Sequence, residues 1–216
     1  MLGALQLAFI DSVNLLLIGV IVAVGIAARH NYAKTTALLI AGDWCGVAGL
    51  ALIMLVIFDG LGPVVQRFVE GPVFGILLIA TGILTAVLAL RGGDNQALVQ
   101  KIMRPLHTPG PATVGTGMVL GLIQSATSLP FYGGLALLSA AGVDAQVRYA
   151  AIPLYATVAL SLPTLAALAV GWVRAKPHSA AARGFDWARA HPDQVTAAAT
   201  WAVAVLLIVL GVTHVM

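Results

Sequence analysis

The sequence Phe9-Ile10-Asp11-Ser12-Val13-Asn14-Leu15-Leu16 places an acid and an amide in the middle of the first long apolar segment. A second polar run, Leu122-Ile123-Gln124-Ser125-Ala126-Thr127-Ser128-Leu129-Pro130, lies near the start of the second half of the chain. Polar groups at such depth in a membrane are costly, so they usually face protein or water and mark a functional pathway. The two runs therefore predict a polar site inside a membrane-spanning fold.

The two runs resemble one another when they are aligned without gaps. Ile10 then matches Ile123, Asp11 lies on Gln124, Ser12 on Ser125, Asn14 on Thr127 and Leu16 on Leu129. So short a match also fits chance similarity between two apolar helices. We interpret it as the trace of an internal repeat.

Composition places the chain in a membrane. It has 216 residues, of which 60% are hydrophobic and 9% are charged, and its mean hydropathy is +1.00. Soluble domains are typically about 25% charged. The net charge of +3 is too small to predict nucleic-acid binding. The single cysteine, Cys45, excludes an intramolecular disulfide.

Six apolar segments are long enough to cross a bilayer, which takes about 20 residues of helix. They are residues 2–28, 35–58, 71–90, 113–141, 149–173 and 196–215. We therefore predict an all-α membrane protein with six transmembrane helices in a single domain, 1–216. Its halves, 1–92 and 112–216, are predicted to be inverted three-helix repeats joined by a cytoplasmic loop over 91–112, as in many secondary transporters.

Basic residues predict the orientation of these segments. Nine of the eleven lie in the connections after the first, third and fifth segments: Arg29, Lys34, Arg91, Lys101, Arg104, Arg174, Lys176, Arg183 and Arg189. Cytoplasmic loops carry the excess of Lys and Arg, so these connections should face the cytoplasm and both termini the outer side. The sequence thus predicts a multi-pass protein of the cytoplasmic (inner) membrane.

Two acidic residues, Asp11 and Asp43, lie inside the predicted spans. A charged carboxylate at the centre of a membrane helix costs about 2.5–3.5 kcal/mol on insertion scales. No basic residue lies inside a span, which favours a proton or a passing cation as the partner. Asn14 shares a helix face with Asp11, so Asp11, Asn14 and Asp43 are the predicted proton-coupling residues. The alternative is a protonated Asp that only holds neighbouring helices together.

Substrate contacts are predicted mainly in the fourth segment. The candidates are Gln124, Ser125, Thr127, Ser128, Pro130 and Tyr132, with Tyr155 from the fifth segment. If the helix unwinds before its proline, the hydroxyl and amide groups there can bind an ion or a polar headgroup. Helix packing by small polar residues is the alternative.

Prolines and glycines predict local features of these helices. Pro130, Pro153 and Pro163 lie in the fourth and fifth segments, so we expect a broken helix in the second half. Gly42 and Gly46 flank Asp43 and predict close helix contact in the second segment. The histidines are too scattered for a metal cluster, and no nucleophile–base pair or phosphate loop is present. We expect no enzyme activity, no cofactor and no metal site.

Three motifs carry a family resemblance: Asp11-Ser12-Val13-Asn14-Leu15, Gly42-Asp43-Trp44, and Ser128-Leu129-Pro130-Phe131-Tyr132 followed by Ala136-Leu137-Leu138. They resemble the LysE (lysine exporter) superfamily, and within it the Sap/GAP (sulfolipid/glycopeptidolipid-addressing protein) family of actinobacterial membrane proteins. The resemblance implies a role in placing glycolipids on the cell surface. Relatives often have Asn-Pro in the first span, where this chain has Asn14-Leu15. The Pro-Gly-Pro of amino-acid exporters occurs only in a predicted loop, at 109–111.

Three functions follow as hypotheses. The first is a proton-coupled secondary transporter that exports, or helps export, a cell-envelope lipid or glycolipid. The second is an exporter of a small cation, metal or amino acid, and the third is a non-transporting accessory subunit. The partners expected are the lipid, protons or another coupling cation, and a second copy in a homodimer.

Overall fold

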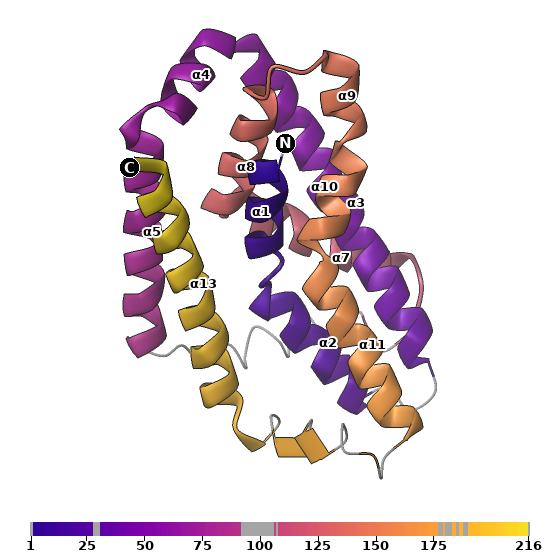
Figure 1. The fold of residues 1–216 in the computed structure, drawn as a ribbon. Coiled ribbons are helices and arrows are strands. Elements are labelled where there is room, and N and C mark those ends of the chain that lie inside the picture. Colours follow the sequence, from indigo (N-terminus) through magenta and orange to yellow (C-terminus); the bar gives the residue numbers. More distant parts are fainter. Residues whose placement is uncertain are drawn as a thin grey trace.

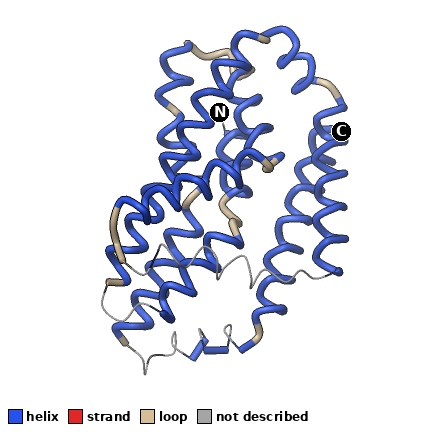
Figure 2. Tube along the Cα trace, turned by 180° about the vertical axis from the view of Figure 1, so that it is seen from behind, coloured by secondary structure: helices blue, strands red, loops and turns tan. Residues whose placement is uncertain are grey.

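The computed structural model describes residues 2–27, 31–91, 106, 108–176, 179, 183–184, 186–187 and 190–215. These parts of the chain form helices and connecting turns and include no strand (Figures 1 and 2). The helices are α1 (Leu2–Asp11), α2 (Leu15–Ala27), α3 (Tyr32–Gly60), α4 (Gly62–Glu70), α5 (Pro72–Arg91), α7 (Pro111–Ala126), α8 (Leu129–Ser139), α9 (Ala145–Ala150), α10 (Ile152–Ala159), α11 (Ser161–Ala175) and α13 (Pro192–Val215). The all-α prediction is confirmed for the described residues. Most of the predicted loop 91–112 lies outside them.

One described helix, α3, is long and apolar enough to cross a bilayer alone. Three further pairs meet the same criterion only when the two helices of a bent pair are taken together. The bends are 47° between Leu2–Asp11 and Leu16–Ile26, 61° between Gly62–Phe68 and Pro72–Leu84, and 42° between Ala145–Ala159 and Ser161–Ala175. By length and composition, the described residues thus provide one span, or up to four. The arrangement as six spans in two repeats stays a prediction.

The first predicted segment is broken, although it contains no proline. We expected the break in the second half, where the prolines lie, and the structure interrupts both halves. Helix α1 ends at Asp11 and α2 begins at Leu15. The physical reason is a polar cap: the Asn14 Oδ1 atom accepts a hydrogen bond from the Leu17 N–H at 2.9 Å. A side-chain oxygen in this position satisfies a donor that the new helix leaves unpaired.

Helices α3 and α7 cross with their backbones almost in contact. Gly42 and Gly46 on α3, and Gly117 and Gly121 on α7, each lie where a Cβ atom would overlap a backbone carbonyl oxygen of the other helix. Small residues four positions apart allow such crossings in membrane helices. The predicted close contact around Gly42 and Gly46 is confirmed, and it brings Asp43 against α7.

Helices α5 and α13 form a second close pair at one edge of the bundle (Figures 1 and 2). A Cβ atom at Gly82 would stand 2.9 Å from the Ala204 carbonyl oxygen, and one at Gly211 would stand 2.7 Å from that of Gly75. Between the two pairs, α1 packs on α8 and α10, and α2 packs on α11. The α1–α2 break therefore lies between the two close pairs.

Polar clusters tie the helices at both ends of the bundle. Where α3 begins and α11 ends, at the lower end of these helices in Figure 1, the Tyr32 hydroxyl donates to the Ala167 carbonyl at 2.8 Å, and Arg174 lies over the Tyr32 ring. At the upper end, the Arg148 guanidinium pairs with the Asp59 carboxylate at 3.1 Å, and Ser139 donates to the same carboxylate at 2.7 Å. Helix α3 thus begins in one cluster and ends in the other.

Candidate functional site

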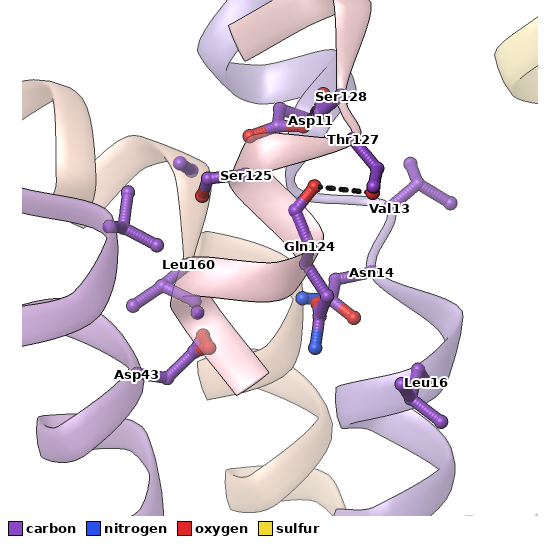
Figure 3. A pocket seen from close by; sticks show the side chains of 13 residues that line it. Asp11, Val13, Asn14, Leu16, Asp43, Gln124, Ser125, Thr127, Ser128 and Leu160 are labelled. Atoms are coloured by element: carbon purple, nitrogen blue, oxygen red, sulfur yellow. Dashed lines mark hydrogen bonds between the residues drawn. The ribbon is translucent and has the colours of Figure 1, made fainter. Parts of the chain in front are cut away.

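A polar cavity of about 290 Å³ lies where three interrupted helices meet. Its walls are Asp11, Val13, Asn14, Leu16, Asp43, Val47, Gly121, Gln124, Ser125, Thr127, Ser128, Ala159 and Leu160. The breaks are those between α1 and α2, between α7 and α8, and between α10 and α11. Figure 3 shows α3 supplying Asp43 on one side of the cavity, with Asp11 and Ser128 together at another.

The first break supplies an acid, an amide and a self-satisfied hydroxyl. Asp11 is the last residue of α1, and Asn14 caps α2. The Ser12 hydroxyl donates back to the Phe9 carbonyl at 2.5 Å, so it binds its own helix rather than the cavity. The Asp11 carboxyl and the Asn14 amide are thereby held on the cavity wall by a short non-helical segment.

The second break is connected to the first through Ser128. The Ser128 hydroxyl donates to the Asp11 carboxylate and accepts a hydrogen bond from the Phe131 N–H at 3.2 Å. One side chain therefore caps α8 and joins it to the end of α1. Hydrogen bonds to ionised groups are roughly twice as strong as neutral ones, so the strength of this connection depends on the charge of Asp11.

Pro130 frees a carbonyl, which a neighbouring side chain then uses. Proline has no N–H to donate to the residue four positions earlier, here Ala126. The Ala126 carbonyl accepts instead from the Tyr132 hydroxyl at 3.0 Å. Thr127 likewise donates its hydroxyl to the Ile123 carbonyl at 3.0 Å. The end of α7 is thus satisfied by side chains, and its break does not depend on a bound ligand.

The third break has the same cause in the fifth predicted segment. Helix α10 ends at Ala159 and α11 begins at Ser161, with Leu160 between them. Pro163 lies in the first turn of α11 and has no N–H for the Ala159 carbonyl. Ala159 and Leu160 both line the cavity, so the third break supplies part of its wall.

The most unusual group in the cavity is the carboxyl of Asp43. Asp43 is fully buried, and neither of its side-chain oxygens has a hydrogen-bond partner among the described residues. Both side-chain polar atoms of Gln124, which lines the same cavity, are also buried and have no hydrogen-bond partner among the described residues. Buried polar groups in proteins are nearly always paired, and an isolated buried charge is strongly unfavourable. Among the described residues, no basic side chain belongs to the cavity wall. The arrangement is therefore suited to hold a proton, a cation or a polar group of a ligand.

The structure brings together most of the predicted site residues and separates the rest. Seven of them line the cavity: Asp11, Asn14, Asp43, Gln124, Ser125, Thr127 and Ser128. Tyr155 is instead 1% exposed in an apolar cluster, where its hydroxyl donates to the Phe131 carbonyl at 3.1 Å. Pro130 is buried outside the cavity wall, and Tyr132 lines a different cavity.

The sequence interpretation missed the apolar wall of the cavity. Leu160 and Ala159 come from the mostly apolar fifth segment, and Val47 and Gly121 come from the crossing of α3 and α7. Pro163 was the available signal for the third break, since it predicts an unpaired carbonyl four residues earlier. Nothing in the sequence placed that carbonyl beside the two polar runs.

An apolar helix long enough to cross a bilayer, next to broken helices around a polar cavity, defines a helical membrane protein. Residues 5–213 match the family described as Sap, sulfolipid-1-addressing protein, and the chain belongs to this family. Neither a curated protein nor a solved structure matches the chain. The resemblance to Sap proteins is thus confirmed, whereas membership of the LysE superfamily stays a prediction.

Proposed function

We propose that this protein is a proton-coupled secondary transporter that exports, or helps export, a cell-envelope lipid or glycolipid across the inner membrane. The observation that carries the proposal is the unpaired, fully buried carboxyl of Asp43 in a cavity formed by three helix breaks. A buried acid without a counter-ion is most stable when it is neutral, so it can take up and release a proton as its surroundings change.

In this proposal, protonation of Asp11 changes how tightly two helices are held together. As a carboxylate, Asp11 accepts the hydrogen bond from Ser128 that joins α1 to α8. A proton on Asp11 weakens that bond, because the acceptor is no longer charged. The α1–α2 and α7–α8 breaks are then free to move relative to each other. Two groups, Asp43 and Asp11, thus link proton binding to the shape of the cavity.

An inverted repeat would give the two sides of the membrane equivalent gates. The α1–α2 and α7–α8 breaks fall within two residues of each other in the alignment of the polar runs. The two end clusters also involve the same pair of predicted spans: the start of α3 meets the end of α11, and the end of α3 meets the last turn of α9. These correspondences support alternating access around the cavity, as repeats do in other transporters.

A lipid substrate is supported by family membership, since the family is described by sulfolipid-1 addressing. The polar run at Gln124 and Ser125 would meet the headgroup. Export of a small cation is the second candidate, because two carboxyls and amide oxygens are the donors that hard cations prefer. The described residues contain no group of three or more His, Cys, Asp or Glu that could hold a metal ion.

Asp43→Asn tests the proposal directly. The purified variant and the wild type would be compared by native mass spectrometry for retained lipid, and in vesicles for lipid movement driven by a pH gradient. We expect the variant to retain an envelope lipid and to lose gradient-driven movement, because an amide cannot exchange a proton. Asp144→Asn, an exposed acid outside the cavity, is the matched control and should behave as wild type. Equal gradient-driven movement by Asp43→Asn and wild type would contradict proton coupling at this site.

A further inference from the structure

A second cavity, of about 260 Å³, lies between α4 and α8. Its walls are Phe58, Val64, Val65, Phe68, Phe74, Leu129, Tyr132, Gly133 and Ala136. They come from the end of α3, from α4, from the start of α5 and from one face of α8. We call this cavity the α4–α8 pocket.

The α4–α8 pocket offers no free polar group among the residues that line it. Its one side-chain hydroxyl, that of Tyr132, is already used by the Ala126 carbonyl. A cavity with apolar walls stays dry, since a water molecule needs two to four polar partners. The pocket therefore fits an occupant that is apolar along its whole length.

The pocket lies along one face of α8. Leu129, Tyr132, Gly133 and Ala136 follow helical spacing and share that face. A Cβ atom at Gly133 would stand 3.0 Å from two ring carbons of Phe74, so the missing side chain lets α8 pack closely against the start of α5. The opposite face of α8, with Phe131 and Leu135, is packed against the core.

The two cavities have wall residues that are neighbours in the sequence at the start of α8. Ser128 lines the polar cavity, and Leu129 lines the pocket. Helix α4 covers the pocket with Val65 and exposes Gln66, Arg67 and Glu70 on its other side. A short helix with one polar and one apolar face is typical of segments that lie along a membrane interface. A polar and an apolar compartment thus have adjacent wall residues at the start of α8, and the apolar one extends along α8 to α4.

We propose that the α4–α8 pocket binds a hydrocarbon chain of the amphiphile whose polar end occupies the cavity at Asp11 and Asp43. The substrate class is then a lipid with at least one linear acyl chain, and α8 separates its two parts. This inference rests on the proposed lipid export for its substrate. The pocket has apolar walls of its own, and its wall residue Leu129 directly follows Ser128 of the polar cavity.

The test uses the full chain in phosphatidylcholine vesicles that contain a palmitoyl lipid with a photoactivatable diazirine in its chain. After illumination, labelled peptides are mapped by mass spectrometry. We expect strong labelling of α4 and α8 in the wild type. Ala136→Leu should lower it roughly tenfold, because the larger side chain displaces about two methylene groups of the lipid chain. Ala80→Leu, an exposed position on α5, is the matched control and should leave the labelling unchanged.

Equal labelling of α4 and α8 in Ala136→Leu and wild type would overturn the inference, because annular lipid on the outer surface labels both alike. Labelling of these helices no stronger than that of other lipid-facing helices would overturn it too, and would favour a partner protein's apolar side chains as the occupant. Phe68→Ala guards against misfolding of the first variant, since it enlarges the pocket and should increase labelling.

The same experiment separates this inference from the proposed function. Asp43→Asn should keep the labelling of α4 and α8, because Asp43 does not line the α4–α8 pocket. Loss of gradient-driven transport with labelling intact supports both proposals. If labelling depends on Ala136 while transport is unchanged in Asp43→Asn, the α4–α8 pocket still binds a hydrocarbon chain, and proton coupling at Asp43 is rejected.

Discussion

The two polar helix breaks of this protein reach the same result by different means. The break after Asp11 contains no proline, whereas the break before Leu129 is followed at once by Pro130. Both end in a side-chain cap: Asn14 accepts from the Leu17 N–H, and Ser128 accepts from the Phe131 N–H. A side-chain cap at the start of the second helix is therefore common to these two breaks. Proline is an addition that frees one more carbonyl.

The two capping side chains make different numbers of contacts. Asn14 holds only the start of its own helix, whereas Ser128 also donates to the Asp11 carboxylate on α1. Removing a cap costs typically about 1 kcal/mol, and losing a hydrogen bond to a charged group costs about 1.5–3 kcal/mol. The free energy of unfolding should therefore fall most for Ser128, less for Asn14 and least for Pro130.

Ser128→Ala should lower the free energy of unfolding by about 2.5–4 kcal/mol, the sum of a lost cap and a lost bond to Asp11. The measurement is reversible unfolding in mixed micelles, followed by circular dichroism. Ser161→Ala is the matched control, because the Ser161 hydroxyl is buried without a hydrogen-bond partner. Equal losses of stability in the two serine variants would show that the hydrogen bond from Ser128 to Asp11 does not stabilise the fold.

Asn14→Ala should cost about 1 kcal/mol, since it removes one cap and no contact between helices. Asn14→Ser should recover most of that loss, because a serine oxygen can accept from the same backbone N–H. The unfolding measurement used for Ser128 checks both variants. A serine variant as unstable as the alanine variant would show that Asn14 stabilises the break through something other than capping.

The polar part of the site could be predicted from the sequence because polarity is rare in these segments. Asp11, Asp43 and the run from Gln124 to Ser128 stand out in an apolar chain, and the structure gathers them in one cavity. The first break could not be predicted from proline, because its segment contains none and the new helix is capped by a single asparagine, Asn14. A rule based on capping would have found it.

The apolar part of the site could not be predicted, because it depends on contacts between distant segments. Leu160 resembles every other leucine in its run until Pro163 frees the carbonyl beside it. The α4–α8 pocket is the space that Gly133 and Ala136 leave against Phe68 and Phe74. Such a space follows from how four helices pack, and local sequence carries no signal of it.

Pro130→Ala tests the smallest of the three effects and decides whether proline makes the second break. Pro130 lies in the first turn of α8, where a backbone N–H has no partner within the helix, so its replacement should change the free energy of unfolding by less than about 0.5 kcal/mol. The restored N–H could then compete with the Tyr132 hydroxyl for the Ala126 carbonyl, and hydrogen exchange at residue 130 would detect that bond. Tyr132→Phe is the companion variant, since it removes the hydroxyl and leaves the proline. A loss for Pro130→Ala as large as that for Ser128→Ala would mean that the proline defines the second break, and the two breaks would then have different origins.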